Sequence, residues 1–317
     1  MKELIRVADA EGRYGKPPSE RSIPELLANG LVVVDKPQGP TSHQVSAWVR
    51  DLVGAPQAGH GGTLDPRVTG VLPIGLGDAT RALDALLVGE KEYVGVMQLH
   101  QDVPEARVRE MMGRFVGEIY QTPPVRAAVK RQLRTRHIFA LEPLEFADRL
   151  GLFRVRCESG TYIRTLCNDL GEALGVGAHM LDLRRTRAAG FTEGDARPVL
   201  HLRDALHAWK EEGDEKALRG ILRPMEALLA HLPSIVIKDT AVDAICHGAN
   251  LAVKGIVRLD ASIRKGGTVS VFTLKGEGVA LATALMPPQG MYDAESGVAA
   301  DTDRVLMRPG TYPKLWR

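Results

Sequence analysis

The stretch AGHGGTLDPRVTGVLPIGLG, residues 58–77, holds a single acidic side chain, Asp65, in a glycine-rich loop. Loops of this kind bend sharply or let the backbone approach a ligand closely. An aspartate is ionised at neutral pH and can act as a nucleophile. Asp-Pro is also common turn chemistry, so a purely structural turn stays open as an alternative.

Two more side chains could serve such chemistry. Arg164 falls in the first turn of a helix expected to start near residue 161, where the helix dipole disfavours a cation. A nearby carboxylate or a substrate phosphate would remove that conflict, and an arginine with its head in water is the alternative. Tyr93 lies in the strand-like KEYVGVMQLH, where Gly95 leaves room for close approach. Taken alone, such a tyrosine is usually a core residue.

Basic residues form two clusters in a chain whose formal net charge is only +2. Residues 125–137, VRAAVKRQLRTRH, carry five Lys or Arg and no acid, and residues 183–187 read LRRTR. Such clusters can steer a polyanion to one face of a protein. A solvated charged face is the alternative for each, and residues 125–137 could also form a hairpin or flap.

The elements expected around these residues are mixed. The apolar run 31–35 predicts a buried strand. Residues 41–54 predict a helix that Thr41 or Ser42 caps, that Gly54 ends, and whose buried face includes Trp48. Strands and helices do not strictly alternate, so we expect an α+β fold with a mixed sheet. Further strands are expected at 92–100, 137–146 and 151–160, and further helices at 78–89, 104–115 and 161–175.

The chain divides into three expected parts. Residues 1–30 are polar and predict an arm that packs on the C-terminal domain. Residues 31–233 form the expected catalytic domain. Residues 234–317, with short strands around one helix, form a small β-rich domain of ordinary size.

Several classes of protein fit poorly. The sequence has no apolar run long enough for a membrane span and no secretory signal at its start. Three cysteines without a CxxC pair fit a reducing cytosol. GLGDAT, residues 75–80, imitates a dinucleotide-binding motif, but its third glycine is Thr80 and we expect a proline-containing loop before it. A Rossmann-type oxidoreductase is therefore a weak alternative.

Four stretches together resemble the TruB/dyskerin family of pseudouridine synthases. They are VVVDKPQGPTSHQV (33–46), GHGGTLDPRVTGVLPIGLGDATR (59–81), KEYVGVMQLH (91–100) and SGTYIRTLCNDLGEALGVGAHMLDLRRTR (159–187). Residues 234–312 resemble a PUA domain, a small RNA-binding β-barrel. The arm and this tail look closest to the archaeal and eukaryotic branch, the catalytic subunit of H/ACA ribonucleoproteins.

The resemblance implies a role for each candidate residue. Asp65 would be the nucleophile, Arg164 its partner, and Tyr93 the side chain that stacks on a flipped uridine and is a candidate in C5 deprotonation. Leu183 would lie under the base, and His60 would help to prise it from its loop. The KPxG motif adds Lys36, and the family's RNA-closing thumb loop adds Lys130, Arg131, Arg134 and Arg136.

The implied reaction isomerises uridine to pseudouridine in RNA and requires no cofactor. The substrate would be uridine 55 of tRNA, a guide-RNA-selected site in rRNA or tRNA, or both. Expected partners are these RNAs and small proteins of zinc-ribbon, Gly/Arg-rich and kink-turn-binding types, in an archaeal cytoplasm. A non-catalytic RNA scaffold is the main rival.

Overall fold

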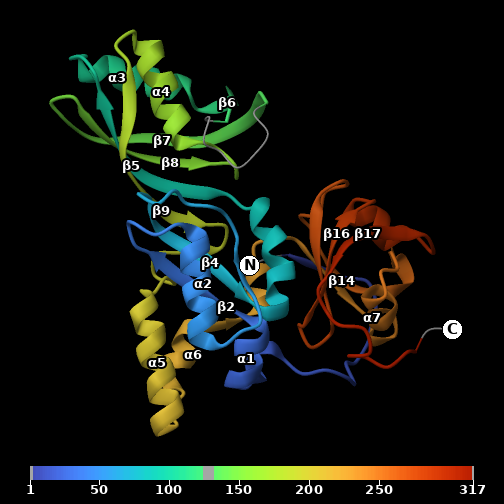
Figure 1. The fold of residues 1–317 in the computed structure, drawn as a ribbon. Helices are drawn as coiled ribbons and strands as arrows, with labels where there is room; N and C mark the ends of the chain where they lie inside the picture. Colours follow the sequence, from blue (N-terminus) through green and yellow to red (C-terminus); the bar gives the residue numbers. More distant parts are fainter. Residues whose placement is uncertain (1–2, 124–131, 316–317) are drawn as a thin grey trace.

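A computed structural model describes residues 3–123 and 132–315 of the chain. These residues form two lobes, each built around one sheet (Figure 1). The first lobe holds every candidate catalytic residue. The second contains the C-terminal strands together with the start of the chain.

The first sheet runs in the order β11-β2-β4-β9-β5-β8-β7-β6, with β3 paired to β4 and β10 to β9. Most neighbours are antiparallel, but β4 and β9 are parallel, so the predicted mixed α+β fold is confirmed. The strands are β2 (Gly30–Lys36), β3 (Ala58–His60), β4 (Thr69–Leu76), β5 (Lys91–Leu99), β6 (Gly117–Gln121), β7 (Arg134–Ala147), β8 (Leu150–Cys157), β9 (Ala178–Ala188), β10 (Phe191–Thr192) and β11 (Leu222–Pro224).

Helices cover this sheet in two groups. In Figure 1, α1, α2 and α5 lie near β2 and β4, whereas α3 and α4 lie at the far end, by β5, β7 and β8. Each group buries its apolar stripe in its own core cluster. The bounds are η1 (Pro18–Glu20), α1 (Ile23–Asn29), α2 (Ser42–Val53), η2 (Gly77–Leu87), α3 (Glu105–Arg114), α4 (Ile163–Leu174), α5 (Val199–Glu212), α6 (Lys216–Ile221) and η3 (Met225–Leu228).

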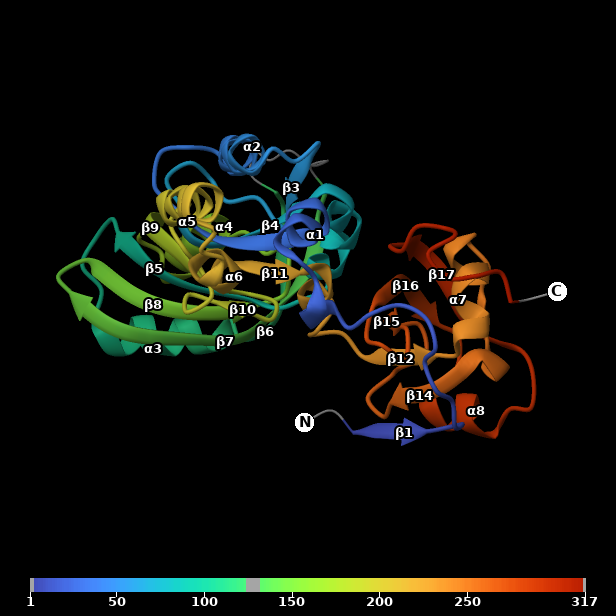
Figure 2. The same ribbon diagram turned by 90° about the horizontal axis from the view of Figure 1, so that it is seen from below.

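The second sheet runs in the order β1-β14-β12-β15-β16-β17-β13. Its edge strand β1 comes from the N-terminal arm and pairs antiparallel with β14 (Figure 2). The tail contains α8 as well as α7, where one helix was expected. The bounds are β1 (Leu4–Arg6), β12 (Ser234–Ile237), α7 (Asp239–Cys246), β13 (Leu251–Ala252), η4 (Val253–Gly255), β14 (Ile256–Asp260), β15 (Thr268–Phe272), β16 (Gly278–Ala284), α8 (Pro288–Asp293) and β17 (Val298–Val305).

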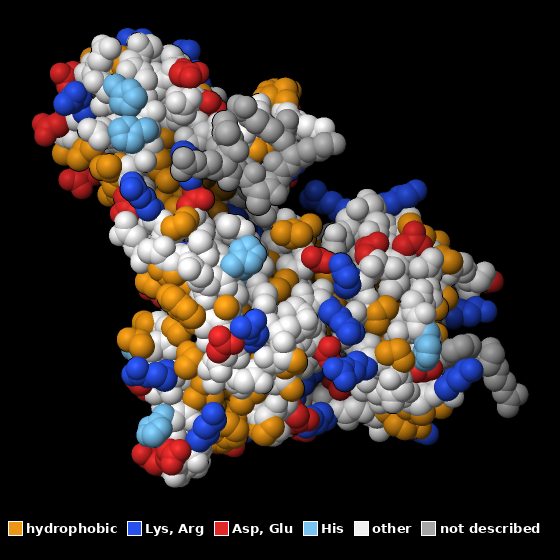
Figure 3. All heavy atoms as spheres, in the orientation of Figure 1, with side chains coloured by type: hydrophobic (Ala, Val, Ile, Leu, Met, Phe, Trp, Pro, Cys, Tyr) orange, Lys and Arg blue, Asp and Glu red, His pale blue; other side chains and the backbone are white. Residues whose placement is uncertain are grey.

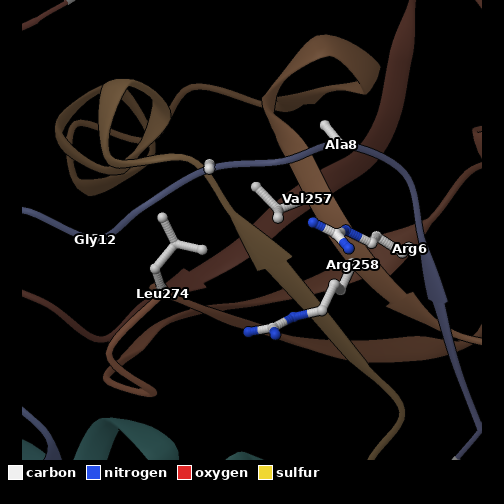
Figure 4. Close-up of a pocket in the computed structure, with 7 residues that line it drawn as sticks. Arg6, Ala8, Gly12, Val257, Arg258 and Leu274 are labelled. Carbon is white, nitrogen blue, oxygen red and sulfur yellow. The ribbon is translucent and has the colours of Figure 1, made fainter.

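The arm covers part of the second lobe and leaves a hollow of about 430 Å³ between them (Figure 4). Arg6 and Arg258 lie opposite each other in the β1–β14 pair and line this hollow. Arg6 also pairs with Asp9 on the arm itself. The arm is therefore fixed to the second lobe by backbone pairing.

The two lobes share buried surface. Leu281 and Leu306 of the second lobe pack in one core cluster with Ala85 and Leu229 of the first. Such a shared core makes a fixed arrangement of the lobes more favourable than a loose tether. Ion pairs between the lobes add to it: Arg304 with Asp84 (2.9 Å) and Arg308 with Asp78 (2.6 Å).

Two local predictions are wrong. The segment before GLGDAT is a strand, β4, in which Pro73 keeps a carbonyl that accepts a hydrogen bond from Gly61. The helix expected at 78–89 is present over residues 77–87 and has the tighter 3₁₀ geometry. Trp48 is 46% exposed, although its neighbours Val45 and Val49 are buried.

Candidate active site

Asp65 is the first residue of a tight turn. The N–H of Val68 donates to the Asp65 carbonyl at 3.0 Å, and Pro66 takes the second position, where its fixed φ suits a turn. The Asp65 side chain is about half exposed. Asp65 therefore forms the turn with its backbone while its carboxylate stays accessible, and the structural turn does not exclude a chemical role for the side chain.

Lys36 binds backbone carbonyl groups of the turn that contains Asp65. It is fully buried, and its Nζ donates to three backbone carbonyls, those of Pro37 (3.0 Å), Pro66 (3.2 Å) and Val68 (2.8 Å). Burial lowers the pKa of this ammonium group from its usual value. An RNA contact by Lys36 stays a prediction, and the three carbonyls already take up all its donors.

Ser42 binds the backbone of Leu64, the residue before Asp65, a contact that sequence reasoning missed because it treated Ser42 only as a possible cap. The cap is Thr41, which accepts from the N–H of Gln44. The buried Ser42 hydroxyl accepts from the N–H of Leu64 at 2.8 Å and donates to its carbonyl at 3.1 Å. The residues on both sides of Asp65, Leu64 and Pro66, are thus held by hydrogen bonds to buried side chains.

Arg164 reaches Asp65 from the start of α4. It is the second residue of that helix, its side chain is about half exposed, and its Nη2 donates to Asp65 Oδ2. The anion expected opposite this arginine is therefore a protein carboxylate. The Asp65 carboxylate offsets the unfavourable position of a cation at the positive end of the α4 dipole.

Tyr93 and Leu183 lie on neighbouring strands beneath this pair. In the β5–β9 register, Tyr93 is opposite Arg185 and Gly95 is opposite Leu183. A Cβ on Gly95 would come within 2.8 Å of Leu183 Cδ1, so only glycine leaves space there. Tyr93, Leu183 and the residues next to the ion pair, Leu64 and Ile163, belong to one buried cluster.

Arg185 is a second residue that the sequence did not single out. It is 1% exposed, donates to the carbonyls of Val71 (2.8 Å) and Gly62 (3.3 Å), and lies against the Tyr93 hydroxyl. Burial raises the pKa of Tyr93, and the Arg185 charge opposes that rise. Its neighbour Arg184 pairs with Asp35 at 3.0 and 3.1 Å and is part-exposed, and Arg187 is exposed, so Arg185 is the buried arginine of the cluster at 183–187.

His60 lies in β3, beside the loop, with its ring edge-to-face to His43 at 4.7 Å. Both of its ring nitrogens are buried without a hydrogen-bond partner among the described residues. Burial, with the nearby charges of His43 and Arg185, lowers the pKa of His60 to about 4. The imidazole is therefore neutral at physiological pH.

The four basic residues expected on RNA are only partly described. Lys130 and Arg131 lie outside the described residues. Arg134 starts β7, opposite Gln121 of β6. Arg136 has a side chain that is 20% exposed and packs over Gly160, just before α4. In the face shown in Figure 3, Lys and Arg side chains also gather where the lobes meet.

No group of three or more His, Cys, Asp or Glu side chains suited to a metal ion occurs among residues 3–123 and 132–315. Within the same ranges, no helix is long and apolar enough to cross a bilayer. The candidate site consists of the Asp65–Arg164 carboxylate–guanidinium pair next to the buried apolar cluster that contains Tyr93 and Leu183.

Sequence profiles of known families match nearly the whole chain. Residues 50–163 match the N-terminal domain of TruB family pseudouridylate synthases, and residues 164–230 match the tRNA pseudouridylate synthase B C-terminal domain. Residues 233–306 match the PUA domain, and residues 7–46 the DKCLD domain. Probable tRNA pseudouridine synthase B of Methanopyrus kandleri is 54% identical over 99% of this chain and 94% of its own length. The Methanocaldococcus jannaschii protein of the same name is 53% identical with the same coverage.

The chain belongs to the TruB family of pseudouridylate synthases. The predicted resemblance and enzyme class are confirmed, and the oxidoreductase alternative is wrong. Solved structures of TruB relatives agree throughout the chain. One from a Cbf5-Nop10-Gar1 complex has a TM-score of 0.93 at 48% identity, covering 99% of this chain and 97% of that one. One from an H/ACA ribonucleoprotein bound to a substrate RNA has a TM-score of 0.91 at 46% identity, covering 100% and 98%.

Proposed function

We propose that Asp65 is the nucleophile of an RNA pseudouridine synthase and that Arg164 orients it. The observation that carries this proposal is the Asp65–Arg164 hydrogen bond above the cluster containing Tyr93 and Leu183. A uracil base inserted there would have the Asp65 carboxylate near its sugar and apolar side chains against its flat face. That combination suits a flipped uridine.

The proposed reaction conserves atoms and electrons. The Asp65 carboxylate attacks C1′ of the uridine, and the N1–C1′ bond breaks with its electron pair on the base. The base turns, C5 attacks C1′ and expels the carboxylate, and the C5 proton is lost while N1 gains one. No oxidant or reductant takes part. A nucleophile held in place by a guanidinium fork loses little freedom at the transition state.

The remaining residues have supporting roles in this proposal. Tyr93 stacks on the base, and its raised pKa favours a neutral phenol in the free enzyme, so its part in C5 deprotonation stays a prediction. Leu183 packs under the base. His60, neutral and without a hydrogen-bond partner in the described part of the chain, helps to displace the target from its stack. Lys36 acts through the turn that presents Asp65.

RNA binding is assigned to two surfaces. Arg134 and Arg136 bind phosphates near the site, Lys130 and Arg131, outside the described residues, are proposed to bind phosphates as well, and the region from about residue 234 binds an RNA end or stem. Residues 234–317 carry ten Lys or Arg against eight acids, so we expect shape and backbone recognition rather than plain charge attraction. Residues 31–233 would then carry out the chemistry and the rest would hold the substrate.

The substrate is proposed from the relatives. Those named tRNA pseudouridine synthase B act on tRNA, as the name says, and the solved relatives belong to H/ACA particles with a substrate RNA or with Nop10 and Gar1. We propose both modes for this chain: modification of tRNA, and guide-directed modification together with small accessory proteins. A kink-turn-binding partner and a cytoplasmic location belong to the same proposal, and buried unpaired cysteines support the location.

One experiment separates these modes. Unmodified tRNA transcript and an rRNA fragment are incubated with the protein alone, with guide RNA, and with guide RNA plus accessory proteins, and pseudouridine is mapped. We expect one modified uridine in tRNA without guide, and guide-dependent modification of the fragment. Binding of RNA without pseudouridine in any mixture would instead favour the non-catalytic scaffold.

A further inference from the structure

The side-chain amide of Gln121, the last residue of β6, forms hydrogen bonds through both its nitrogen and its oxygen with the backbone of one residue, Tyr162. Gln121 is 2% exposed. Its Nε2 donates to the Tyr162 carbonyl at 3.1 Å, and the Tyr162 N–H donates to its Oε1 at 2.9 Å. A buried amide with both groups satisfied fixes its partner in position as well as in distance.

Tyr162 is the residue on which α4 starts. It is the N-cap, its carbonyl also accepts the N–H of Leu166 at 3.0 Å, and its own side chain makes no capping hydrogen bond. Helix starts usually depend on a side-chain cap for this anchoring. Here Gln121 instead holds the backbone N–H and carbonyl of the N-cap residue itself, two residues before Arg164.

The segment before Tyr162 is fixed independently by β7. Glu158 donates its N–H to the His137 carbonyl at 2.8 Å, and its Oε2 accepts from the His137 N–H at 3.1 Å. The body of α4 buries Leu166, Leu170 and Leu174 in the core. Loss of the Gln121 contacts would therefore change the start of the helix more than the fold.

We propose that Gln121 is a positioning residue for the isomerisation: it fixes the start of α4 so that Arg164 keeps its hydrogen bond to Asp65. This inference rests on the proposed roles of Asp65 and Arg164. Gln121 touches neither of them, so it acts through the Tyr162 backbone.

The test is Gln121→Glu, which keeps the shape and makes one contact depend on pH. An ionised carboxylate accepts from the Tyr162 N–H but faces the Tyr162 carbonyl without a donor. A protonated carboxyl donates to that carbonyl and restores both bonds, and burial raises the pKa of such a group toward the range in which the enzyme can be assayed. Single-turnover rates at saturating RNA are measured from pH 5.5 to 8.5, as the ratio of variant to unmodified enzyme.

We expect a rate about tenfold below that of the unmodified enzyme at pH 8, with the ratio rising as pH falls. RNA affinity should change little over this range, whereas the thermal unfolding midpoint of the variant should fall as pH rises, because a group whose pKa is raised by folding destabilises the fold when it ionises. Gln57→Glu is the matched control, because Gln57 also donates to a backbone carbonyl, that of Gly77 at 3.0 Å, but is exposed and away from α4. Its ratio should stay near one at every pH.

A Gln121→Glu ratio near one at all pH values, or a loss that does not depend on pH, would overturn the proposal. If this variant does not fold, Gln121→Met replaces it, and the expectation becomes a pH-independent rate loss in a folded protein with unchanged RNA affinity. A Met variant with the unmodified enzyme's rate would also overturn it. An inactive Asp65→Asn beside a fully active Gln121→Glu would reject the positioning role alone, whereas an active Asp65→Asn would reject the proposed function.

Discussion

The guanidinium of Arg164 donates a hydrogen bond to the carboxylate of Asp65, although 99 residues separate them in the sequence. Both side chains are about half exposed, so water and salt screen their attraction. Exposed pairs of this kind contribute about 0–1 kcal/mol to stability. The pair is therefore better explained by the orientation of a reactive carboxylate than by a need to hold the fold together.

Replacement of Arg164 should reduce the rate much more than the stability. Arg164→Ala should lose most single-turnover activity, by about 100-fold or more, and Arg164→Lys should recover only part of it, because an ammonium lacks the planar two-point geometry of a guanidinium. The midpoint of thermal unfolding should move little. Arg109→Lys is the matched control, since Arg109 forms a similarly exposed pair with Glu105 at 2.6 Å. A fully active Arg164→Lys would show that charge alone is enough.

Replacement of Lys36 tests whether this residue binds RNA or supports the turn. Lys36→Met leaves three buried carbonyls without their donor, which should cost about 2–4 kcal/mol in the free energy of unfolding and reduce the rate. The dependence of RNA affinity on salt should not change, because no phosphate contact is lost. Urea unfolding and a salt series of binding measurements check both statements, with the exposed Lys210→Met as control.

The opposite pattern for Lys36→Met would support a direct RNA contact. That pattern is unchanged stability together with a slope of log affinity against log salt that falls by about one.

Gly95→Ala should disturb the floor of the site. The new Cβ would lie 2.8 Å from Leu183 Cδ1 and 2.9 Å from Phe153 Cζ, so at least one of these side chains must shift. Overpacking of this kind costs about 1–3 kcal/mol. We expect a lower unfolding midpoint and a reduced rate at saturating RNA, and Gly95→Ala combined with Leu183→Val should recover part of both. A single variant as stable and active as the unmodified enzyme would mean that no base packs closely there.

Stability should fall with acid partly because of His60. Its folded pKa is about 4, below its ordinary value of 6.5, so the unfolded chain takes up a proton that the folded chain resists. The contribution is complete above pH 6.5 and is lost as pH falls toward 4. His60→Phe cannot take up that proton, so its loss of unfolding free energy between pH 7.5 and 4.5 should be smaller, on the order of 1 kcal/mol after allowance for screening.

Urea unfolding across this pH range measures the His60 effect, with the exposed His207→Gln as control. Equal acid sensitivity of His60→Phe and the unmodified protein would contradict the low pKa.

The sequence predicts the local elements of the site well because their signals are local. The loop glycines, the Thr41 cap and the helix start before Arg164 each have a short-range physical reason. What the sequence could not predict is the burial of charge. Lys36 and Arg185 look like surface cations in the sequence, yet both are buried, because several carbonyls from distant segments converge on them. Gln121 escaped notice for the same reason, since its partner lies 41 residues away.

The wrong predictions outside the site, at Pro73 and Trp48, also result from how neighbouring elements pack. Pro73 argued for a loop, but its carbonyl accepts from Gly61 while β2, β3 and β9 supply the rest of the pairing of β4. Trp48 shares a helical face with buried residues, yet it lies in a shallow apolar depression between α2 and α5 that leaves it partly open. Periodicity places a residue on a face, and only the packing of neighbouring elements determines how far that face is covered.

The role of Asp65 as nucleophile is tested most directly by Asp65→Asn. The amide keeps the shape of the side chain but cannot serve as an anionic nucleophile. The measurement is single-turnover pseudouridine formation at saturating RNA, with RNA affinity and thermal unfolding determined on the same preparation. The account predicts a folded protein that binds RNA about as tightly as the unmodified enzyme and forms no measurable pseudouridine. Formation at more than about 1% of the unmodified rate, which corresponds to a loss of less than about 3 kcal/mol of transition-state stabilisation, would contradict it.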